Sequence, residues 1–191
     1  MGMAIQVPCY TAAEVRGFDN PRLRFEVIRG ELLVTPAPGT LHQRMVVALL
    51  RALQDYVERH GIGEALVAPF EVEFADDTAV QPDVLVILAD RADRLEAERL
   101  YGAPSLVVEV VSYSSKRVDR LQKRELYLTE GVGEYWVVDP GLRRVERWIA
   151  GAVSPELSTN RLEWCPDTSV PPLDINLHEL FDRAHRGLGK G

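Results

Sequence analysis

The clearest periodic pattern in the chain lies between residues 41 and 59, where apolar side chains recur every three or four positions. The positions that share this spacing are Met45, Val46, Leu49, Leu50, Leu53, Tyr56 and Val57. Such spacing places them on one face of a helix. Gly61 and Gly63 follow, and glycine commonly ends a helix. The pattern predicts a long amphipathic helix over residues 41–59.

Shorter apolar runs predict the strands of a sheet. The expected strands cover residues 23–28, 31–35, 65–74, 84–88, 105–111, 134–138 and 144–149. The first two are joined through Arg29-Gly30, which favours a β-hairpin, and Pro36 and Pro38 follow them. The runs 84–88 and 105–111 are almost entirely apolar, which is typical of strands buried on both faces.

Further helices are expected between and after these strands. They cover residues 92–100, 115–129 and 177–186, and a capping box at Thr11–Glu14 predicts a short helix that ends by Gly17. Because strands and helices are mixed, and a helix separates central strands, the sequence predicts an α/β (α+β) domain with one mixed sheet.

Length and composition fit one globular domain over residues 1–191. The chain is 46% hydrophobic and 27% charged, which excludes a disordered or fibrous protein. Its two cysteines, Cys9 and Cys165, are too few for a disulfide framework and lack metal-ligand spacing. The chain has no apolar run of membrane-spanning length and no secretory signal pattern, so we expect a cytoplasmic protein without a membrane partner.

Net charge limits how the chain could bind nucleic acid. There are 22 basic and 29 acidic residues, a formal net charge of −7. Proteins that bind nucleic acid through bulk charge are basic, so any such role here needs a local basic patch or a metal ion. One segment meets this need: residues 116–124 hold one acid and the five basic residues Lys116, Arg117, Arg120, Lys123 and Arg124.

Two acidic residues stand where apolar residues are expected. Glu109 lies in the middle of the apolar run 105–111, and Asp83 follows Pro82 at the start of the run 84–88. Alone, Glu109 fits an edge strand facing water or a salt bridge to a core arginine, and Asp83 fits a turn. Together they place two carboxylates on or beside neighbouring buried strands, where a divalent cation is the usual reason to keep both ionised.

Other polar residues admit two interpretations each. On the helix expected after Glu109, Lys116, Asp119, Arg120, Lys123 and Tyr127 share one side. This side is either a solvated charged face with an Asp119–Lys123 pair or part of a site. His42, near the start of the long helix, is a surface residue, a helix-end hydrogen-bonding group or a site residue. The chain lacks the Gly-x-Ser-x-Gly and Walker patterns, which leaves a metal site as the candidate chemistry.

Pro82-Asp83 followed by Glu109 resembles the Pro-Asp…(Asp/Glu)-x-Lys signature of the restriction-endonuclease-like superfamily. The chain is more closely similar to the Uma2 family, formerly a domain of unknown function, over about residues 10–150. The matching segments are 25–31, Pro36-Ala-Pro38 with His42, 81–84, 106–112, Asp119-x-x-x-Lys123-x-x-x-Tyr127 and 131–140. One departure is Val111, which stands where the superfamily signature has its lysine. The resemblance implies that Lys123, on the next helix, replaces it.

The resemblance implies a restriction-endonuclease-like fold, with a central mixed sheet flanked by helices and an N-terminal hairpin. Residues 10–150 would form the core and residues 151–191 a C-terminal extension with a terminal helix. The implied activity is a Mg²⁺- or Mn²⁺-dependent nuclease in which Asp83 and Glu109 hold the metal, with the Val110 carbonyl as a further candidate. Lys123 would position the attacking water or offset charge on the phosphate.

The remaining implied roles are less direct. Glu26, His42 and Tyr127 are secondary candidates for the site. Lys116, Arg117, Arg120 and Arg124 would contact the backbone of nucleic acid, with DNA as the expected substrate. The apolar strands around Trp148 and Trp164 suggest exposed surface and hence a homodimer.

Two alternatives stay open at this stage. One is a binding or assembly module that keeps the nuclease fold without turnover, with its charged groups separated or locked in salt bridges. The other is a hydrolase of small phosphate esters, which suits an acidic surface better than long DNA does.

Overall fold

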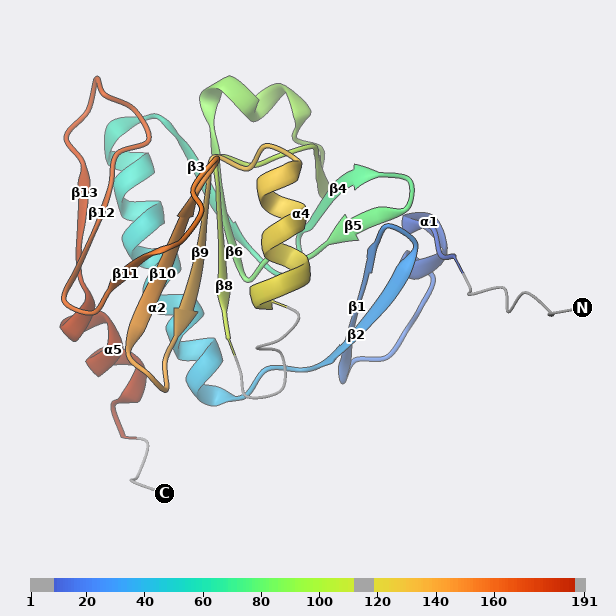
Figure 1. Cartoon of the computed structure of the whole chain (residues 1–191), viewed down its shortest axis with the longest axis horizontal. Helices are drawn as coiled ribbons and strands as arrows, with labels where there is room; N and C mark the ends of the chain where they lie inside the picture. Colours follow the sequence, from blue (N-terminus) through green and yellow to red (C-terminus); the bar gives the residue numbers. More distant parts are fainter. Residues whose placement is uncertain (1–8, 112–118, 188–191) are drawn as a thin grey trace, which may run out of the picture.

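The computed structural model describes residues 9–111 and 119–187, which form two mixed sheets, a two-stranded sheet and helices on both faces of the larger sheet (Figure 1). In spatial order the larger, six-stranded sheet contains β11 (Glu156–Ser158), β10 (Arg144–Ile149), β9 (Glu134–Asp139), β8 (Leu106–Val110), β6 (Val84–Leu88) and β3 (Gly63–Val67). Only β8 and β9 run parallel in this sheet; the other neighbours are antiparallel.

The remaining elements flank this sheet. The five-stranded sheet contains β2 (Glu31–Pro36), β1 (Leu23–Ile28), β5 (Thr78–Val80), β4 (Glu71–Ala75) and β7 (Arg99–Tyr101), and the small sheet pairs β12 (Arg161–Trp164) with β13 (Leu173–Asn176). The described helical segments are α1 (Ala12–Arg16), α2 (Thr40–His60), the 3₁₀ helix η1 (Ala89–Arg94), the π-helical turn η2 (Asp119–Lys123), α4 (Arg124–Thr129) and α5 (Leu177–His185).

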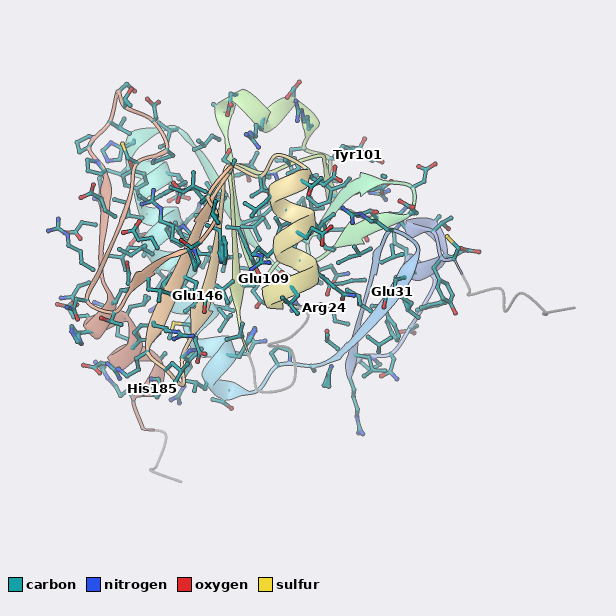
Figure 2. All side chains as sticks on the ribbon, in the orientation of Figure 1. Arg24, Glu31, Tyr101, Glu109, Glu146 and His185 are labelled. Carbon is teal, nitrogen blue, oxygen red and sulfur yellow. The ribbon has the colours of Figure 1, made fainter. Side chains whose placement is uncertain are left out.

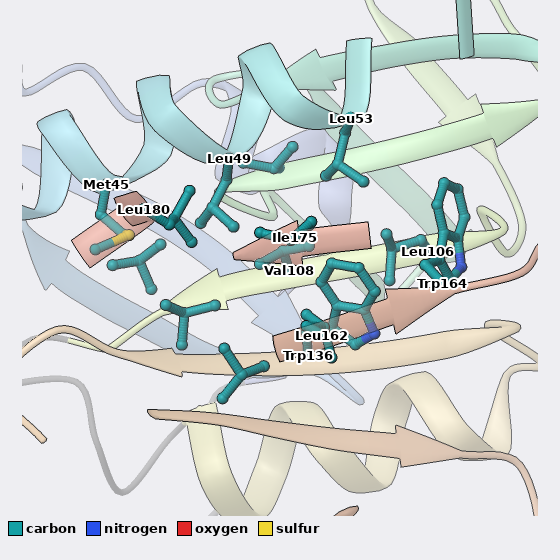
Figure 3. Close-up of a cluster of buried hydrophobic side chains, with 14 of the residues drawn as sticks. Met45, Leu49, Leu53, Leu106, Val108, Trp136, Leu162, Trp164, Ile175 and Leu180 are labelled. Carbon is teal, nitrogen blue, oxygen red and sulfur yellow. The ribbon is translucent and has the colours of Figure 1, made fainter. Parts of the chain in front are cut away.

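Helix α2 covers one face of the six-stranded sheet, as its periodicity predicts. Met45, Leu49 and Leu53 are fully buried against strand residues that include Val108 and Trp136 (Figure 3). Helix α5 and strands β12 and β13 complete this layer and add the buried side chains Leu162, Trp164, Ile175 and Leu180. The C-terminal segment therefore contributes directly to the core.

Helix α4 packs on the opposite face and connects β8 to the parallel strand β9. Its Leu126 and Tyr127 join a core with Val107 of β8 and Tyr135 of β9. Side chains alternate along a strand, so Glu109 points to the same side as Val107. The buried carboxylate thus faces α4 and not α2.

Two predicted N-terminal features are confirmed. Thr11 and Glu14 form a capping box at α1, which ends at Gly17. Strands β1 and β2 form a hairpin whose turn residues Arg29 and Gly30 have φ angles of 51° and 79°. Both angles lie in the left-handed region that tight hairpin turns require, which glycine adopts without steric cost.

Three predictions about the fold are wrong: one strand, one helix and the number of sheets. The expected strand over residues 65–74 is two strands, β3 and β4, in different sheets. Pro69 lies between them and has no backbone N–H to donate, which favours the break. The expected helix over residues 92–100 is instead the 3₁₀ helix η1 followed by β7, because η1 has no buried side chain to hold a longer helix in place. The single mixed sheet is three sheets, although the expected central mixed sheet flanked by helices is confirmed in the six-stranded one.

The two tryptophans within the apolar strands expected to be exposed are themselves buried. Trp148 is 8% exposed and Trp164 is 1% exposed, because both side chains pack into the cores on either side of the sheet. Neighbouring apolar side chains of β10 and β11, Ile149 and Leu157, are exposed, so a homodimer stays a prediction. Across residues 9–111 and 119–187, no helix combines the length and the apolar character needed to span a membrane.

Candidate active site

Asp83, the residue before β6, lies beside Glu109 of the paired strand β8. Val84 of β6 is opposite Val108 of the antiparallel strand β8. Asp83 comes just before Val84 and Glu109 just after Val108, so the two acids are opposite each other. Their exposed fractions are 3% and 2%. The Asp83 Oδ2 atom accepts a hydrogen bond from the Val110 backbone N–H at 2.9 Å. This bond ties the Asp83 carboxylate directly to the strand that carries Glu109.

Strand β1 brings a further acid and a base to the same place. Arg24 and Glu26 are two residues apart and therefore point to one face of the strand. Glu26 Oε1 accepts a hydrogen bond from the Gln81 N–H at 2.7 Å, and Arg24 Nη1 donates to Asp83 Oδ1 at 3.0 Å. Figure 2 shows Arg24 and Glu109 near the lower end of α4, between the six-stranded sheet and the hairpin β1–β2.

Lys123 and Tyr127 reach the carboxylates from the helix that follows β8. Lys123 Nζ lies 2.9 Å from Glu26 Oε1 and 2.9 Å from Glu109 Oε1, and Lys123 is 2% exposed. The Tyr127 hydroxyl donates to Glu109 Oε1 at 2.8 Å. The i,i+4 spacing of Lys123 and Tyr127 lets both act on one carboxylate. The alternative of a solvated charged face is therefore wrong for these two residues.

His42 is the remaining secondary candidate, and it also reaches the cluster. From the first turn of α2 its Nε2 atom donates to Asp83 Oδ2 at 2.9 Å, and its side chain is 11% exposed. The alternative of a surface histidine is wrong. Its buried Nδ1 atom has no hydrogen-bond partner among the described residues.

The charges of the cluster hold Asp83 ionised. Burial alone would raise the pKa of Asp83, but the hydrogen bond from His42 and the charges of His42, Arg24 and Lys123 outweigh it and lower the pKa to about 2. Burial, together with the negative charges of Glu109 and Glu26, raises the pKa of Tyr127 well above its usual value. Tyr127 therefore stays protonated and donates its hydrogen bond at any ordinary pH.

The lowered pKa of Asp83 predicts a specific acid dependence of stability. An unfolded aspartate has a pKa near 3.8, so Asp83 contributes its full stabilisation above about pH 4 and loses it as the pH falls through about 2. We expect Asp83→Asn to destabilise the protein at pH 5, and this difference from the wild type to shrink by on the order of 2 kcal/mol at pH 2. Urea unfolding at a series of pH values measures it. A stability difference between Asp83→Asn and the wild type that is constant with pH would contradict the lowered pKa of Asp83.

The predicted basic cluster is described only in part. Lys116 and Arg117 lie outside the described residues, and the side chains of Asp119 and Arg120 are likewise not described. The Arg124 guanidinium lies over the Trp148 ring, 4.6 Å from its centre. The role of these four basic residues in binding nucleic acid thus stays a prediction.

The sequence analysis missed Arg24. It holds Asp83 and also donates to the Gln81 carbonyl at 3.1 Å. The one signal in the sequence was spacing, since Arg24 and Glu26 are two residues apart in an expected strand and so share one face. A charged residue two positions before a candidate acid was therefore a candidate counter-ion.

The donor atoms of the cluster fit a hard divalent cation. Three buried carboxylates, Glu26, Asp83 and Glu109, converge here, and two permanent cations, Arg24 and Lys123, offset part of their charge. Carboxylate oxygens are the ligands that Mg²⁺ prefers, and Mg²⁺ commonly binds one or two of them. In the described part of the chain no three His, Cys, Asp or Glu side chains are close enough to share a metal ion. A metal would therefore rest on two carboxylates, with other oxygens completing its shell.

Comparisons with known proteins agree with this architecture. A crystal structure described as "a putative nuclease belonging to DUF820", from Anabaena variabilis, superposes with a TM-score of 0.76 at 19% sequence identity. The match covers 92% of this chain and 99% of that one, and so establishes a shared mixed α/β fold. No curated protein sequence is significantly similar to the chain. The model of the Uma2 family, described as "Putative restriction endonuclease", matches residues 8–171, and on that match the chain belongs to the Uma2 family.

Proposed function

We propose that the protein is a metal-dependent endonuclease that hydrolyses phosphodiester bonds of nucleic acid, with DNA as the expected substrate. The observation that carries the proposal is the convergence of Asp83, Glu109 and Lys123 in one buried, hydrogen-bonded cluster. These residues come from two strands and a helix, and nothing in local folding requires them to meet. Membership of a family described as "Putative restriction endonuclease" supports the same chemistry.

Asp83 and Glu109 would hold Mg²⁺ or Mn²⁺, with the Val110 carbonyl as a further ligand. When bound, such a cation supplies Lewis-acid activation of water and of a phosphoryl oxygen. Two contacts to Asp83, from Arg24 and His42, fix both oxygens of its carboxylate. The site residues are thus held in place before any substrate arrives, which lowers the cost of assembling the reactive arrangement.

Lys123 has two tasks in this proposal. Its ammonium group bridges Glu26 and Glu109, so it neutralises part of their charge and orients the Glu109 carboxylate together with Tyr127. It also places a positive charge beside the point where negative charge develops on the phosphate during hydrolysis. Glu26 has the role of a positioning residue, because its Oε1 atom holds Lys123.

One observation favours a second candidate, the binding or assembly module without turnover. Glu109 Oε1 already accepts from Lys123 and Tyr127, and Asp83 accepts from three groups, so the cluster is well satisfied without a metal. A nuclease-fold module that had lost its activity would show the same ion pairs.

Cleavage assays separate the two candidates. Supercoiled plasmid, single-stranded DNA and RNA are incubated at low salt with Mg²⁺ or Mn²⁺, and parallel reactions contain EDTA. We expect cleavage of at least one substrate that stops with EDTA and returns when excess metal is added. If binding is detected with all three substrates but none is cleaved in either metal, the binding module is the better account.

A further inference from the structure

A groove between α2 and α5 carries an unusual concentration of positive charge for this acidic chain. Its volume is about 860 Å³, and the described residues that line it include Arg44, Arg51, Arg183 and Arg186 but no acid. All four arginines are exposed. The whole chain has a formal net charge of −7, so this surface differs in sign from the protein as a whole.

These four guanidinium groups lack acidic partners. Among the described residues, none of them forms an ion pair, whereas nine other arginines do, Arg147 with Glu134 for example. The one hydrogen bond among the four joins the Arg44 side chain to the Arg186 backbone carbonyl and so links the two helices. Uncompensated arginines in one groove repel each other, and an anion that binds there relieves this repulsion.

Helix geometry aligns part of this charge along a line. One face of α2, opposite the face buried on the sheet, lines the groove. It carries Thr40, Arg44, Val47, Ala48 and Arg51. Arg44 and Arg51 are seven positions apart, which is about 10 Å along the helix axis. That distance equals about three steps of 3.4 Å along one strand of DNA. Arginine is also suited to phosphate, because its planar group donates two parallel hydrogen bonds.

The groove and the acidic cluster share the first turn of α2. Thr40 and Gln43 line the groove, and His42 between them contacts Asp83. This turn contains no acidic residue, and its N-cap, Gly39, offers no side-chain acceptor, so the positive end of the helix dipole adds to the arginine charge. Figure 1 shows α5 and the start of α2 at the lower edge of the view, the edge toward which β8 runs.

We propose that this groove binds the phosphate backbone of the nucleic acid whose cleavage the proposed function places at Asp83 and Glu109, and the inference rests on that function. Arg44, Arg51, Arg183 and Arg186 would contact phosphates without reading bases. Backbone contacts of this kind position a nucleic acid without sequence preference. They also make the affinity strongly dependent on salt.

Fluorescence anisotropy in EDTA tests the groove without cleavage. The probes are a labelled 20-base-pair DNA duplex and single strands of DNA and RNA, titrated from 50 to 200 mM NaCl. The test variant is Arg51→Gln/Arg183→Gln, because neither side chain has a described partner to lose. The control is Arg59→Gln/Arg94→Gln, which removes the same charge from two exposed arginines outside the groove.

We expect the groove variant to bind at least about tenfold more weakly at 100 mM salt, and its salt dependence to fall by about two released ions. The control should change affinity by less than about twofold. Equal weakening in both variants, no change in the groove variant, or no binding of any probe by the wild type would overturn the inference. If the groove variant keeps both the affinity and the cleavage rate of the wild type, the groove is not the binding surface, and the nuclease proposal is unaffected. Groove-dependent binding without cleavage by the wild type refutes only the nuclease proposal.

Discussion

Glu109→Gln should abolish metal-dependent cleavage while leaving the protein folded. Glutamine keeps the shape of the side chain and can still accept the hydrogen bond from Tyr127, but it lacks the charge that a divalent cation needs. Lys123 keeps its contact with Glu26, so no buried ammonium is left unpaired. We expect the cleavage rate to fall at least about 1,000-fold, equivalent to about 4 kcal/mol of transition-state stabilisation. Initial rates of plasmid nicking measure this.

The matched control is Glu146→Gln, the same substitution at a glutamate of β10 that is 9% exposed and pairs with Arg144. Figure 2 labels both glutamates, and Glu146 lies on β10, two strands away from Glu109 on β8. This variant should cleave at a rate within about twofold of the wild type, because Glu146 has no role in the proposed reaction. If Glu109→Gln cleaves at the wild-type rate, the activity belongs to another group or another protein.

Lys123→Met should be among the most destabilising single substitutions in the chain. Methionine fills most of the volume of lysine but leaves Glu26 and Glu109, which are 2% exposed, without their shared positive charge. Breaking a buried ion pair by removing one partner costs about 3–5 kcal/mol, because the remaining charge stays desolvated. Urea unfolding at pH 7 gives the free energy of unfolding of each variant.

Two further variants separate lost charge from lost packing. Arg161→Met removes one side of the exposed pair with Asp174 and should cost at most about 1 kcal/mol. Adding Glu109→Gln to Lys123→Met removes one of the two stranded carboxylates, so the double variant should recover part of the lost stability. A Lys123→Met cost no larger than that of Arg161→Met would contradict the buried-pair account.

The elements that the sequence predicted well are those with long local patterns. Helix α2 follows from seven apolar positions at helical spacing, and β6 and β8 follow from uninterrupted apolar runs. The pairing of β7 with β4 depends on contacts between residues far apart along the chain. Periodicity cannot specify such contacts, which is why the predicted single sheet was wrong.

The candidate site was predictable because its residues break local patterns. Glu109 interrupts an apolar strand, and a buried carboxylate needs a partner. Lys123 was expected at the site because the chain resembles the Uma2 family. Arg24 and the four groove arginines were not predictable in the same way. A charged residue on a partly exposed strand or helix has the same sequence signal whether it faces water, an ion partner or a ligand. Arg124 is an example. Its position in the basic segment 116–124 predicts a side chain available to nucleic acid, but its guanidinium stacks on Trp148.

Titration of Mn²⁺ into the metal-free protein by calorimetry tests the central claim most directly, because the result does not depend on which nucleic acid is the substrate. The account predicts one saturable site per chain in the wild type and in Glu146→Gln, and loss of that site in both Glu109→Gln and Asp83→Asn. Binding of Mn²⁺ that is unchanged by either site substitution, or no binding by the wild type, would contradict a metal centre at Asp83 and Glu109.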